Sequence, residues 1–226
     1  CGWAGLFTAI AGFAEEAKIT GITLSDHQFS HACNMVAAAG LDSSVDFHLH
    51  DYRDQTGHFD KIVSVGMLEH VEAQGYANYF AKIRALLADE GIAVIHRIGV
   101  QHKPGPVNRW ITSYIFAGGY LPSIGQMIRH TETRGLKVLD MEVMRGHYAE
   151  TLRLWRMRFL DRRAAMRRLY DARFVRMWEF YLVGCEYFFR RQHGMVLQLQ
   201  LAKDQMAAPM SQHCTQNREN EFKDRL

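Results

Sequence analysis

The feature that most constrains the fold is a regular alternation of short β-rich runs with longer amphipathic stretches along the first part of the chain. Four runs rich in β-branched residues have the length of strands, at 18–24, 45–50, 59–65 and 91–98. Two stretches, 25–39 and 75–88, have the length and periodicity of helices. This order predicts an α/β fold in which helices cover a mostly parallel, doubly wound sheet.

The second half of the chain adds two β-rich runs, 137–144 and 195–202, separated by a long helical stretch from about 151 to 191. We therefore expect a helical insertion formed by residues of about 104–130 and 151–192. A chain of 226 residues with 48% hydrophobic content is able to bury one sizeable core. We predict a single domain over 1–203 and a disordered tail over the polar segment 204–226.

The chain begins with a glycine-rich turn, Cys1-Gly2-Trp3-Ala4-Gly5, that leads into a predicted helix at 6–17. In doubly wound folds such a turn follows a central strand and brings backbone N–H groups close to a ligand. No strand precedes the turn in this sequence, so we expect the first strand to be missing. The next two predicted strands end at Thr23-Leu24-Ser25 and His50-Asp51-Tyr52, at the edge where nucleotides bind in such sheets.

Charge and cysteine content narrow the function classes. The formal net charge of +3 is too small to indicate a nucleic-acid partner. The four cysteines are scattered and lack the spacing of a zinc site, so we expect no metal and a reducing, cytoplasmic setting. No run approaches the roughly 18 apolar residues that span a bilayer.

Positive charge is concentrated in one segment. Nine arginines fall between Arg153 and Arg176, where the only acidic residues are Asp161 and Asp171. Two interpretations stay open for these arginines. They form either a solvated helix face or a surface for anionic lipid, where each basic residue contributes about 1 kcal/mol of attraction.

A series of further motifs follows the opening CGWAG in a fixed order. They are ITLS (22–25), DYRD (51–54), FDKIVSVGMLEHV (59–71), IHRIG (95–99), YIFAGGYLPS (114–123), HYAETLRLW (147–155) and RMWEFYL (176–182). Together these motifs resemble the cyclopropane-fatty-acyl-phospholipid synthase and mycolic acid cyclopropane synthase family of S-adenosylmethionine-dependent methyltransferases. The resemblance reaches to about Lys203. It implies a Rossmann-like methyltransferase domain whose last strand is antiparallel.

By this resemblance, nine residues approach S-adenosylmethionine. They are Gly2, Trp3, Gly5, Thr23, Leu24, Ser25, Gln28, Asp51 and Tyr52. The first three line the methionine and ribose end of the cofactor, the next four approach the ribose, and the last two flank the adenine. Ala4 stands where the family commonly has glycine, which narrows the conformational freedom of the turn.

The implied chemistry needs a base. An alkene that attacks a sulfonium methyl group becomes a carbocation, and closing a cyclopropane ring then requires loss of a proton from the new methyl group. The resemblance implies bound bicarbonate as that base, anchored by Glu69, His96, Tyr148 and the backbone of Ile98. A carboxylate accepts the bicarbonate O–H, while imidazole N–H and phenol O–H donate to its oxygens. From the residues alone, structural roles are favoured instead: Glu69 in a helix cap, His96 as a core histidine and Tyr148 in packing.

The helical insertion is rich in aromatic residues, which ordinarily pack between helices. They include Trp110, Tyr114, Phe116, Tyr120, Phe174, Trp178, Tyr181, Phe188 and Phe189. A few of them are expected to line an acyl tunnel, where ring faces would stabilise a carbocation. The sequence does not indicate which ones.

The predicted reaction is methyl transfer to the cis double bond of an unsaturated phospholipid acyl chain, by a protein attached peripherally to the anionic inner face of the membrane. Other readings stay open because a fold does not fix its chemistry. One is a methyltransferase for an oxygen or nitrogen of a small molecule. A second leaves a branched or hydroxylated chain, and a third is an inactive lipid-binding relative. The oligomeric state is also open, a homodimer included.

Overall fold

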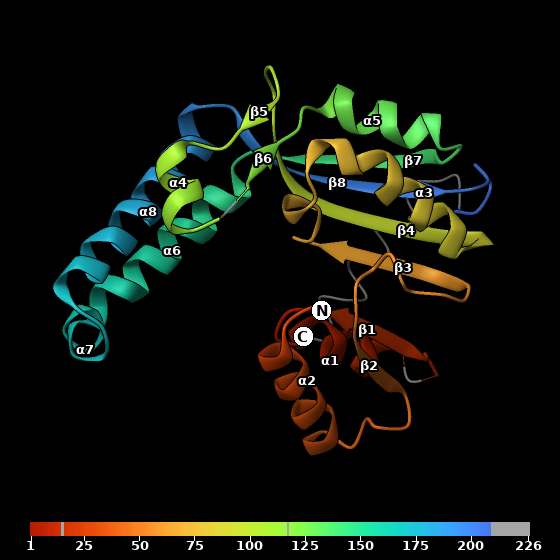
Figure 1. The fold of residues 1–226 in the computed structure, drawn as a ribbon, viewed down its shortest axis with the longest axis horizontal. Helices are drawn as coiled ribbons and strands as arrows, with labels where there is room; N and C mark the ends of the chain where they lie inside the picture. Colours follow the sequence, from red (N-terminus) through yellow and green to blue (C-terminus); the bar gives the residue numbers. More distant parts are fainter. Residues whose placement is uncertain (15, 117, 209–226) are drawn as a thin grey trace. The chain divides into compact units, whose positions relative to one another are not determined.

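The computed structural model describes residues 1–14, 16–116 and 118–208. Contacts divide the chain into two compact units (Figure 1), an N-terminal unit of Cys1–Gly57 and a C-terminal unit from His58 onward. Most of the predicted tail, 209–226, lies outside the described residues. The single domain predicted over 1–203 stays a prediction.

The N-terminal unit contains α1 (Gly5–Phe13), β1 (Ile19–Thr23), α2 (Asp26–Ala38) and β2 (Val45–Leu49). The two strands pair in parallel, as the crossover helix between them requires. Within the described residues no strand precedes α1, and β1 pairs with β2 only. A small core lies between the helices and strands of this unit, formed by Ala4, Ala11, Ala32, Val36, Val45 and Phe47.

The C-terminal unit is built on a four-stranded sheet. Its strands are β3 (Phe59–Val65), β4 (Leu87–Val100), β7 (Lys137–Met144) and β8 (Gly194–Ala202), in the order β3-β4-β8-β7. β3 and β4 are parallel, whereas β8 runs antiparallel to both β4 and β7. The expected antiparallel last strand is therefore confirmed, and so is the mixed α/β fold.

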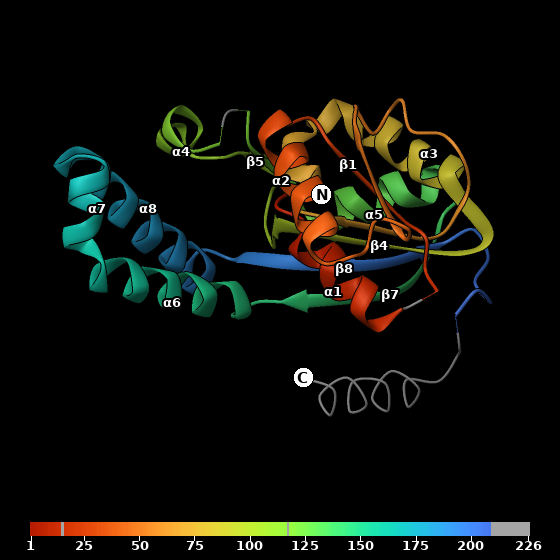
Figure 2. The ribbon, with the colours of Figure 1, turned by 90° about the horizontal axis from the view of Figure 1, so that it is seen from below.

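One face of this sheet is covered by α3 (Tyr76–Leu86) and α5 (Ile124–Thr133), as Figures 1 and 2 show together. Two single-turn 3₁₀ helices, η1 (Leu68–His70) and η2 (Ala73–Gly75), connect β3 to α3. Because η1 follows the carboxyl end of β3 directly, its side chains lie at the edge where α/β folds place their ligands.

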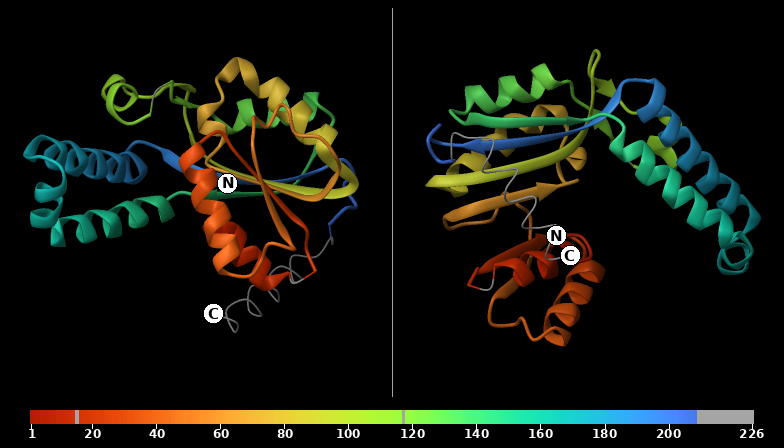
Figure 3. Two further views of the ribbon diagram at one scale, coloured as in Figure 1. Left: turned by 60° about the horizontal axis from the view of Figure 1, so that its bottom comes forward. Right: turned by 180° about the vertical axis from the view of Figure 1, so that it is seen from behind.

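A helical hairpin projects from the ends of β7 and β8 (Figure 3). It consists of α6 (His147–Asp161), α7 (Arg163–Leu169) and α8 (Ala172–Arg191). Beside it lie α4 (Arg109–Tyr114) and the short strands β5 (Gly105–Pro106) and β6 (Tyr120–Leu121). The predicted long helical stretch is thus three helices. Asp171 begins the last of them, because its carboxylate accepts the N–H of Phe174 at 2.6 Å.

None of the helices in the described part of the chain is both long enough and apolar enough to cross a membrane.

Candidate active site

The C-terminal unit contains a cavity of about 1050 Å³ between the helical hairpin, α4 and the carboxyl end of β4. Its walls are mainly apolar and aromatic, and helix α8 supplies one wall along most of its length. The α8 residues that line it lie mainly on one face of the helix: Arg173, Arg176, Met177, Phe180, Tyr181, Gly184, Cys185, Tyr187, Phe188 and Phe189. A cavity of this size and lining suits a long apolar ligand.

Glu69 lines this cavity from η1. Its Oε1 accepts the backbone N–H of Ile98 at 2.6 Å, across 29 residues of sequence. Its Oε2 is buried and has no hydrogen-bond partner among the described residues. An unpaired buried carboxylate oxygen is costly, so a site that keeps one is prepared for a donor from outside the chain.

Tyr148, the second residue of α6, lines the same cavity, and its ring centroid lies 5.0 Å from that of Phe189. Burial raises the pKa of Tyr148, and the neighbouring Cys185 and Glu69 raise it further. Its hydroxyl group therefore stays protonated and available as a donor. Burial likewise raises the pKa of the Cys185 thiol, to about 11.

The structure brings Glu69, Ile98 and Tyr148 to one cavity, but His96 is not among the residues that line it. His96 is half-buried in β4, between Val65 of β3 and Gln198 of β8. The backbone of Ile98 was predicted to help anchor the anion, and in the structure its N–H donates to Glu69 Oε1. The Ile98 amide thus orients the Glu69 carboxylate. The predicted roles of Glu69, His96, Tyr148 and Ile98 in anchoring bicarbonate stay predictions.

Arg97 is a buried residue that the sequence reading did not single out. Its side chain is 1% exposed on the opposite face of β4. The guanidinium donates to Tyr76 Oη at 2.8 Å and to the carbonyls of Ile98, Leu68 and Tyr120 at 2.8, 3.4 and 3.1 Å. Leu68 precedes Glu69, so Arg97 ties together both segments that hold the carboxylate.

The glycine turn of the N-terminal unit has a left-handed backbone at two positions, Gly2 (φ +55°) and Ala4 (φ +64°). For a residue with a Cβ this conformation costs about 1–2 kcal/mol, and the fully buried Ala4 adopts it where the family commonly has glycine. A side chain built on Gly2 or Gly5 would meet no atom within 4 Å. Trp3 between them is 59% exposed. The turn thus has open space in front of it.

The residues predicted to approach the ribose form a small network at the end of β1. Thr23 Oγ1 donates to Gln28 Oε1 at 3.1 Å, and Ser25 Oγ accepts the Gln28 N–H at 3.3 Å as the N-cap of α2. The N–H of Ser25 in turn donates to Thr23 Oγ1 at 3.2 Å. Leu24 at the centre of this loop is 72% exposed.

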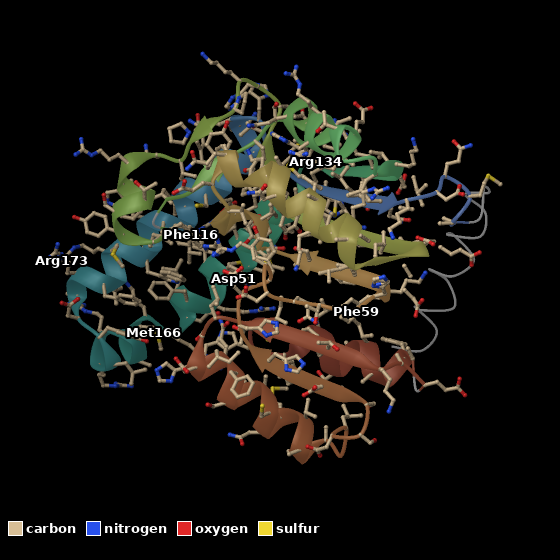
Figure 4. All side chains as sticks on the ribbon, turned by 45° about the vertical axis from the view of Figure 1, so that its right-hand side comes forward. Asp51, Phe59, Phe116, Arg134, Met166 and Arg173 are labelled. Atoms are coloured by element: carbon tan, nitrogen blue, oxygen red, sulfur yellow. The ribbon has the colours of Figure 1, made fainter. Side chains whose placement is uncertain are left out.

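At the end of β2, Asp51 forms an ion pair with Arg53. Its Oδ1 accepts from Arg53 Nε at 2.8 Å and its Oδ2 from Nη2 at 2.9 Å. These hydrogen bonds hold the pKa of Asp51 below its usual range. Tyr52 is half-buried, and burial raises its pKa. The label in Figure 4 marks Asp51 on this loop.

Comparison with known proteins identifies the family. A family model described as mycolic acid cyclopropane synthetase matches residues 1–199. The chain belongs to this family. A tuberculostearic acid methyltransferase of Mycobacterium tuberculosis is 41% identical over 209 residues, which cover 90% of this chain and 48% of that protein. The cyclopropane-fatty-acyl-phospholipid synthase of Escherichia coli is 37% identical over 190 residues, covering 84% of this chain and 48% of that protein.

Solved structures of cyclopropane synthases have the same fold as this chain. The cyclopropane synthase MmaA2 of Mycobacterium tuberculosis matches with a TM-score of 0.83 and 23% identity, over 90% of this chain and 75% of that chain. The mycolic acid cyclopropane synthase CmaA1, complexed with SAH and CTAB, matches with a TM-score of 0.80 and 26% identity, over 89% of this chain and 75% of that chain. The resemblance inferred from the motifs is therefore confirmed: the chain is a member of the cyclopropane synthase family of methyltransferases. It spans about half the length of the curated relatives it matches.

The structure also shows which aromatic residues of the insertion line the cavity. Trp110, Tyr114, Phe116, Tyr120, Tyr181, Phe188 and Phe189 do so, whereas Phe174 and Trp178 do not. Phe180 and Tyr187 also line the cavity, but they were not predicted to do so from the sequence. Phe180 lies four residues after Arg176 and directly before Tyr181, so it belongs to the same face of the helix. A search of 172–191 for one face with a spacing of three to four residues would have found much of this wall.

Proposed function

We propose that the protein carrying this chain methylates the cis double bond of an unsaturated phospholipid acyl chain and closes a cyclopropane ring. One observation carries this proposal: Glu69 lines a large apolar cavity and keeps a buried carboxylate oxygen that has no partner in the described residues. An acyl chain fits such a cavity, and an amine or hydroxyl acceptor would not need the apolar lining. The names of the relatives reported above describe enzymes that act on lipids.

The residues of the N-terminal unit fit S-adenosylmethionine. Gly2 and Gly5 leave open space before a helix N-terminus, and Trp3 and Leu24 offer exposed apolar surface. Thr23, Ser25 and Gln28 carry the hydroxyl and amide groups that hydrogen-bond ribose hydroxyls. Asp51 and Tyr52 would flank the adenine. When bound, the cofactor supplies an electrophilic methyl group.

The residues at the cavity also fit a small anion that carries a proton. The free Oε2 of Glu69 would accept its O–H, and the protonated Tyr148 would donate to one of its oxygens. His96 is proposed as a further donor, and Ile98 fixes the carboxylate through its N–H. Bicarbonate, when bound, supplies the base that the ring closure needs.

The chain's own groups then have three tasks. Glu69 and Tyr148 hold the proton acceptor beside the reacting carbons. The buried aromatic residues Tyr181 and Phe189, next to Tyr148, would keep water from the reacting carbons, where it would otherwise capture the carbocation as an alcohol. Their ring faces stabilise the positive charge while it exists, by about 0.5–2 kcal/mol for each well-placed ring.

A second product is favoured by one finding, the 41% identity to a tuberculostearic acid methyltransferase. In that case the carbocation rearranges by a hydride shift and loses a proton to leave a methylene branch, and a separate hydride donor, such as a reduced nicotinamide or flavin cofactor of another protein, would have to reduce it to the methyl branch. Mass spectrometry separates the two products. The cyclopropane product is heavier than the alkene by one methylene group, whereas the branched product carries two more hydrogens.

The arginine-rich hairpin supports peripheral attachment to the anionic, cytoplasmic face of a membrane. Leu169 and Tyr170 are exposed between α7 and α8, next to Arg167 and Arg168. Vesicle sedimentation tests this. Binding should increase with anionic lipid and weaken as salt rises, since charges are screened over about 10 Å at 0.1 M salt. Equal binding to neutral vesicles at all salt concentrations would contradict it.

The cofactor assignment is tested by titration calorimetry of the full-length protein with S-adenosylmethionine. We expect one site per chain and competition by S-adenosylhomocysteine. The absence of heat and of competition at saturating concentrations would refute the assignment. Incubation with unsaturated phospholipid and mass spectrometry of the extracted acyl chains then tests the reaction.

A further inference from the structure

The wall that α8 contributes to the cavity changes character along the helix. From Met177 to Phe189 its lining residues are mostly apolar or aromatic, but the first two lining residues are Arg173 and Arg176. These arginines are three residues apart and so lie on one face of the helix. Figure 4 shows Arg173 near the α7 end of α8, with Phe116 labelled closer to the sheet. The cavity therefore has a cationic end.

Arg173 and Arg176 are the hairpin arginines that line the cavity, and neither is paired with a carboxylate among the described residues. Four arginines of the hairpin pair with glutamates: Arg153 with Glu150, Arg156 with Glu186, Arg163 with Glu179, and Arg190 with Glu150 and Glu186. Neither Arg173 nor Arg176 forms a hydrogen bond or ion pair within the described residues. The three hairpin glutamates are thus all engaged elsewhere. Two guanidinium groups remain free at the cavity.

The spacing along α8 matches the dimensions of a phospholipid. The reacting end of the cavity lies at Cys185, which neighbours Tyr148. At 1.5 Å per residue, Cys185 is about 14 Å along the helix from Arg176 and about 18 Å from Arg173. In one bilayer leaflet the middle of an acyl chain lies about 7 Å deep in the hydrocarbon core, and the headgroup region adds about 5–7 Å, so the reacting carbons lie on the order of 13 Å from the phosphate group.

We propose that Arg173 and Arg176 bind the phosphodiester of the lipid headgroup and thereby set which carbon atoms of the acyl chain reach Glu69 and Tyr148. This inference rests on the proposed function and names the headgroup subsite of the same cavity. Arginine suits the role because its planar group donates two parallel hydrogen bonds to phosphate oxygens. The start of α8 adds the positive end of a helix dipole.

The test compares two lipids with identical monounsaturated chains in neutral detergent micelles, at a lipid fraction and salt concentration that keep general attraction to the micelle surface small. Phosphatidylglycerol carries the phosphodiester, and diacylglycerol lacks it. In the full-length protein, the double variant Arg173→Gln and Arg176→Gln should raise KM for phosphatidylglycerol at least tenfold. The KM for diacylglycerol should change less than twofold. A second set of lipids, with the double bond moved along the chain, should show that the variant has lost the wild-type preference for one position.

The matched control is the double variant Arg167→Gln and Arg168→Gln. These two α7 arginines are exposed, have no ion-pair partner in the described residues and do not line the cavity. Arg167 and Arg168 are proposed to contact only an anionic membrane surface, which the micelles lack, so their replacement should leave KM and positional preference unchanged in micelles while it weakens binding to anionic vesicles. Equal effects of the two double variants, or equal effects on both lipids, would overturn the proposal. Lys103, which also lines the cavity, is the rival anchor, and a tenfold effect of Lys103→Gln alone would move the site there.

A binding measurement separates this proposal from the proposed function. Trp110 lines the cavity, so a saturated phosphatidylglycerol brominated at mid-chain should quench its fluorescence without being methylated. The Trp110→Phe variant identifies that part of the signal. Quenching that depends on Arg173 and Arg176 supports the phosphate site even if no lipid is methylated. Equal quenching in wild type and double variant refutes it. Stronger quenching by the same brominated chain carried on a phosphopantetheine thioester also refutes it, because the site would then prefer a thioester to a phospholipid.

Discussion

In the N-terminal unit the polar side chains predicted to meet the cofactor already bond to one another, whereas the C-terminal unit keeps a buried carboxylate oxygen with no partner in the described residues. Thr23, Ser25 and Gln28 form a closed network on a loop whose Leu24 is exposed. Glu69 is bonded on one side only. The two sites differ in how far their polar groups are removed from water.

Ser25 and Gln28 are partly exposed, so they can exchange internal hydrogen bonds for bonds to a ligand at little net cost, because water satisfies these groups in between. A buried carboxylate has no such exchange, and leaving Oε2 unpaired lowers stability. Binding energy at the first site should therefore be spread over several weak contacts. At the second site it should be concentrated in one residue.

The largest expected effect is that of Glu69→Gln. The amide keeps the shape of the side chain but replaces the anionic acceptor that faces the cavity. Losing one hydrogen bond to a charged group costs about 1.5–3 kcal/mol, which lowers the rate roughly tenfold to more than a hundredfold if the bond is needed in the transition state. S-adenosylmethionine affinity, measured by calorimetry, should stay within twofold. Product formation is measured by lipid mass spectrometry.

The control for this variant is bicarbonate supply. In carbon-dioxide-depleted buffer the variant should be slowest, and added bicarbonate should restore part of its activity by mass action. If the variant forms cyclopropane at the wild-type rate in depleted buffer, Glu69 does not hold the base, and the contrast between the two units disappears.

The second effect concerns the framework behind Glu69. Arg97→Leu removes a buried charge, which by itself is favourable, but it strands the hydroxyl of Tyr76 and the carbonyls of Leu68 and Tyr120. Breaking such a buried network typically costs about 3 kcal/mol or more, so the loss should dominate. Chemical denaturation should show lower stability and an unchanged m-value. Tyr76→Phe, which removes one partner, should cost about 1 kcal/mol. Equal stability of Arg97→Leu and wild type would mean that the network contributes no net stability.

Much of the sheet was predictable from the sequence. The runs 59–65 and 137–144 coincide with β3 and β7, and 91–98 lies inside the longer β4. Alternating, β-branched runs bounded by polar residues leave little choice of structure. The turn after Asp161 was not predictable, because the sequence from Arg162 to Leu169 has strong helix formers and no glycine or proline. Packing of α6 against α8 overrides that propensity.

The site was predictable in part. Glu69, Ile98 and Tyr148 were assigned by resemblance, and the structure brings them to one cavity. The bond between Glu69 and Ile98 joins residues far apart in sequence, and no local pattern encodes it. In the sequence, Arg97 is only a charged residue in an otherwise apolar strand. Its role could not be predicted, because its partners come from three separate segments. The roles predicted for these residues and for His96 stay predictions.

A third effect uses two of the half-buried thiols, Cys33 in the N-terminal unit and Cys185 at the cavity. Burial raises the pKa of Cys185 to about 11, above its usual value of about 9. The folded state therefore keeps a proton that the unfolded state loses, so this thiol's contribution to stability falls as pH rises from about 9 to 11. Iodoacetamide labelling of Cys185, quantified on its own peptide, should stay slow up to about pH 9 and then increase.

Cys33, labelled in the same sample, is the internal reference for reagent and unfolding. Saturating unsaturated lipid should slow Cys185 labelling further without affecting Cys33, because only Cys185 lines the cavity. Rapid Cys185 labelling at neutral pH, matching that of Cys33, would show that the cavity is open to water and would weaken the contrast between the units.

The smallest effect compares two serines that have the same local role. Ser25 caps α2 by accepting the N–H of Gln28, and Ser123 caps α5 by accepting the N–H of Gln126, both at 3.3 Å. Replacing either serine with alanine removes one N-cap, which costs about 1 kcal/mol of stability. The two variants should therefore lower the melting temperature by similar amounts. Only Ser25→Ala should also weaken S-adenosylmethionine binding. The loss should be modest, about tenfold or less, because Thr23 and Gln28 remain beside the ribose and the contacts are shared. Calorimetric titration of both variants at a temperature where each is fully folded measures this difference. If Ser123→Ala weakens cofactor binding as much as Ser25→Ala, the loss reflects general destabilisation. If neither does, Ser25 is only a helix cap and the ribose contacts must come from Thr23 and Gln28.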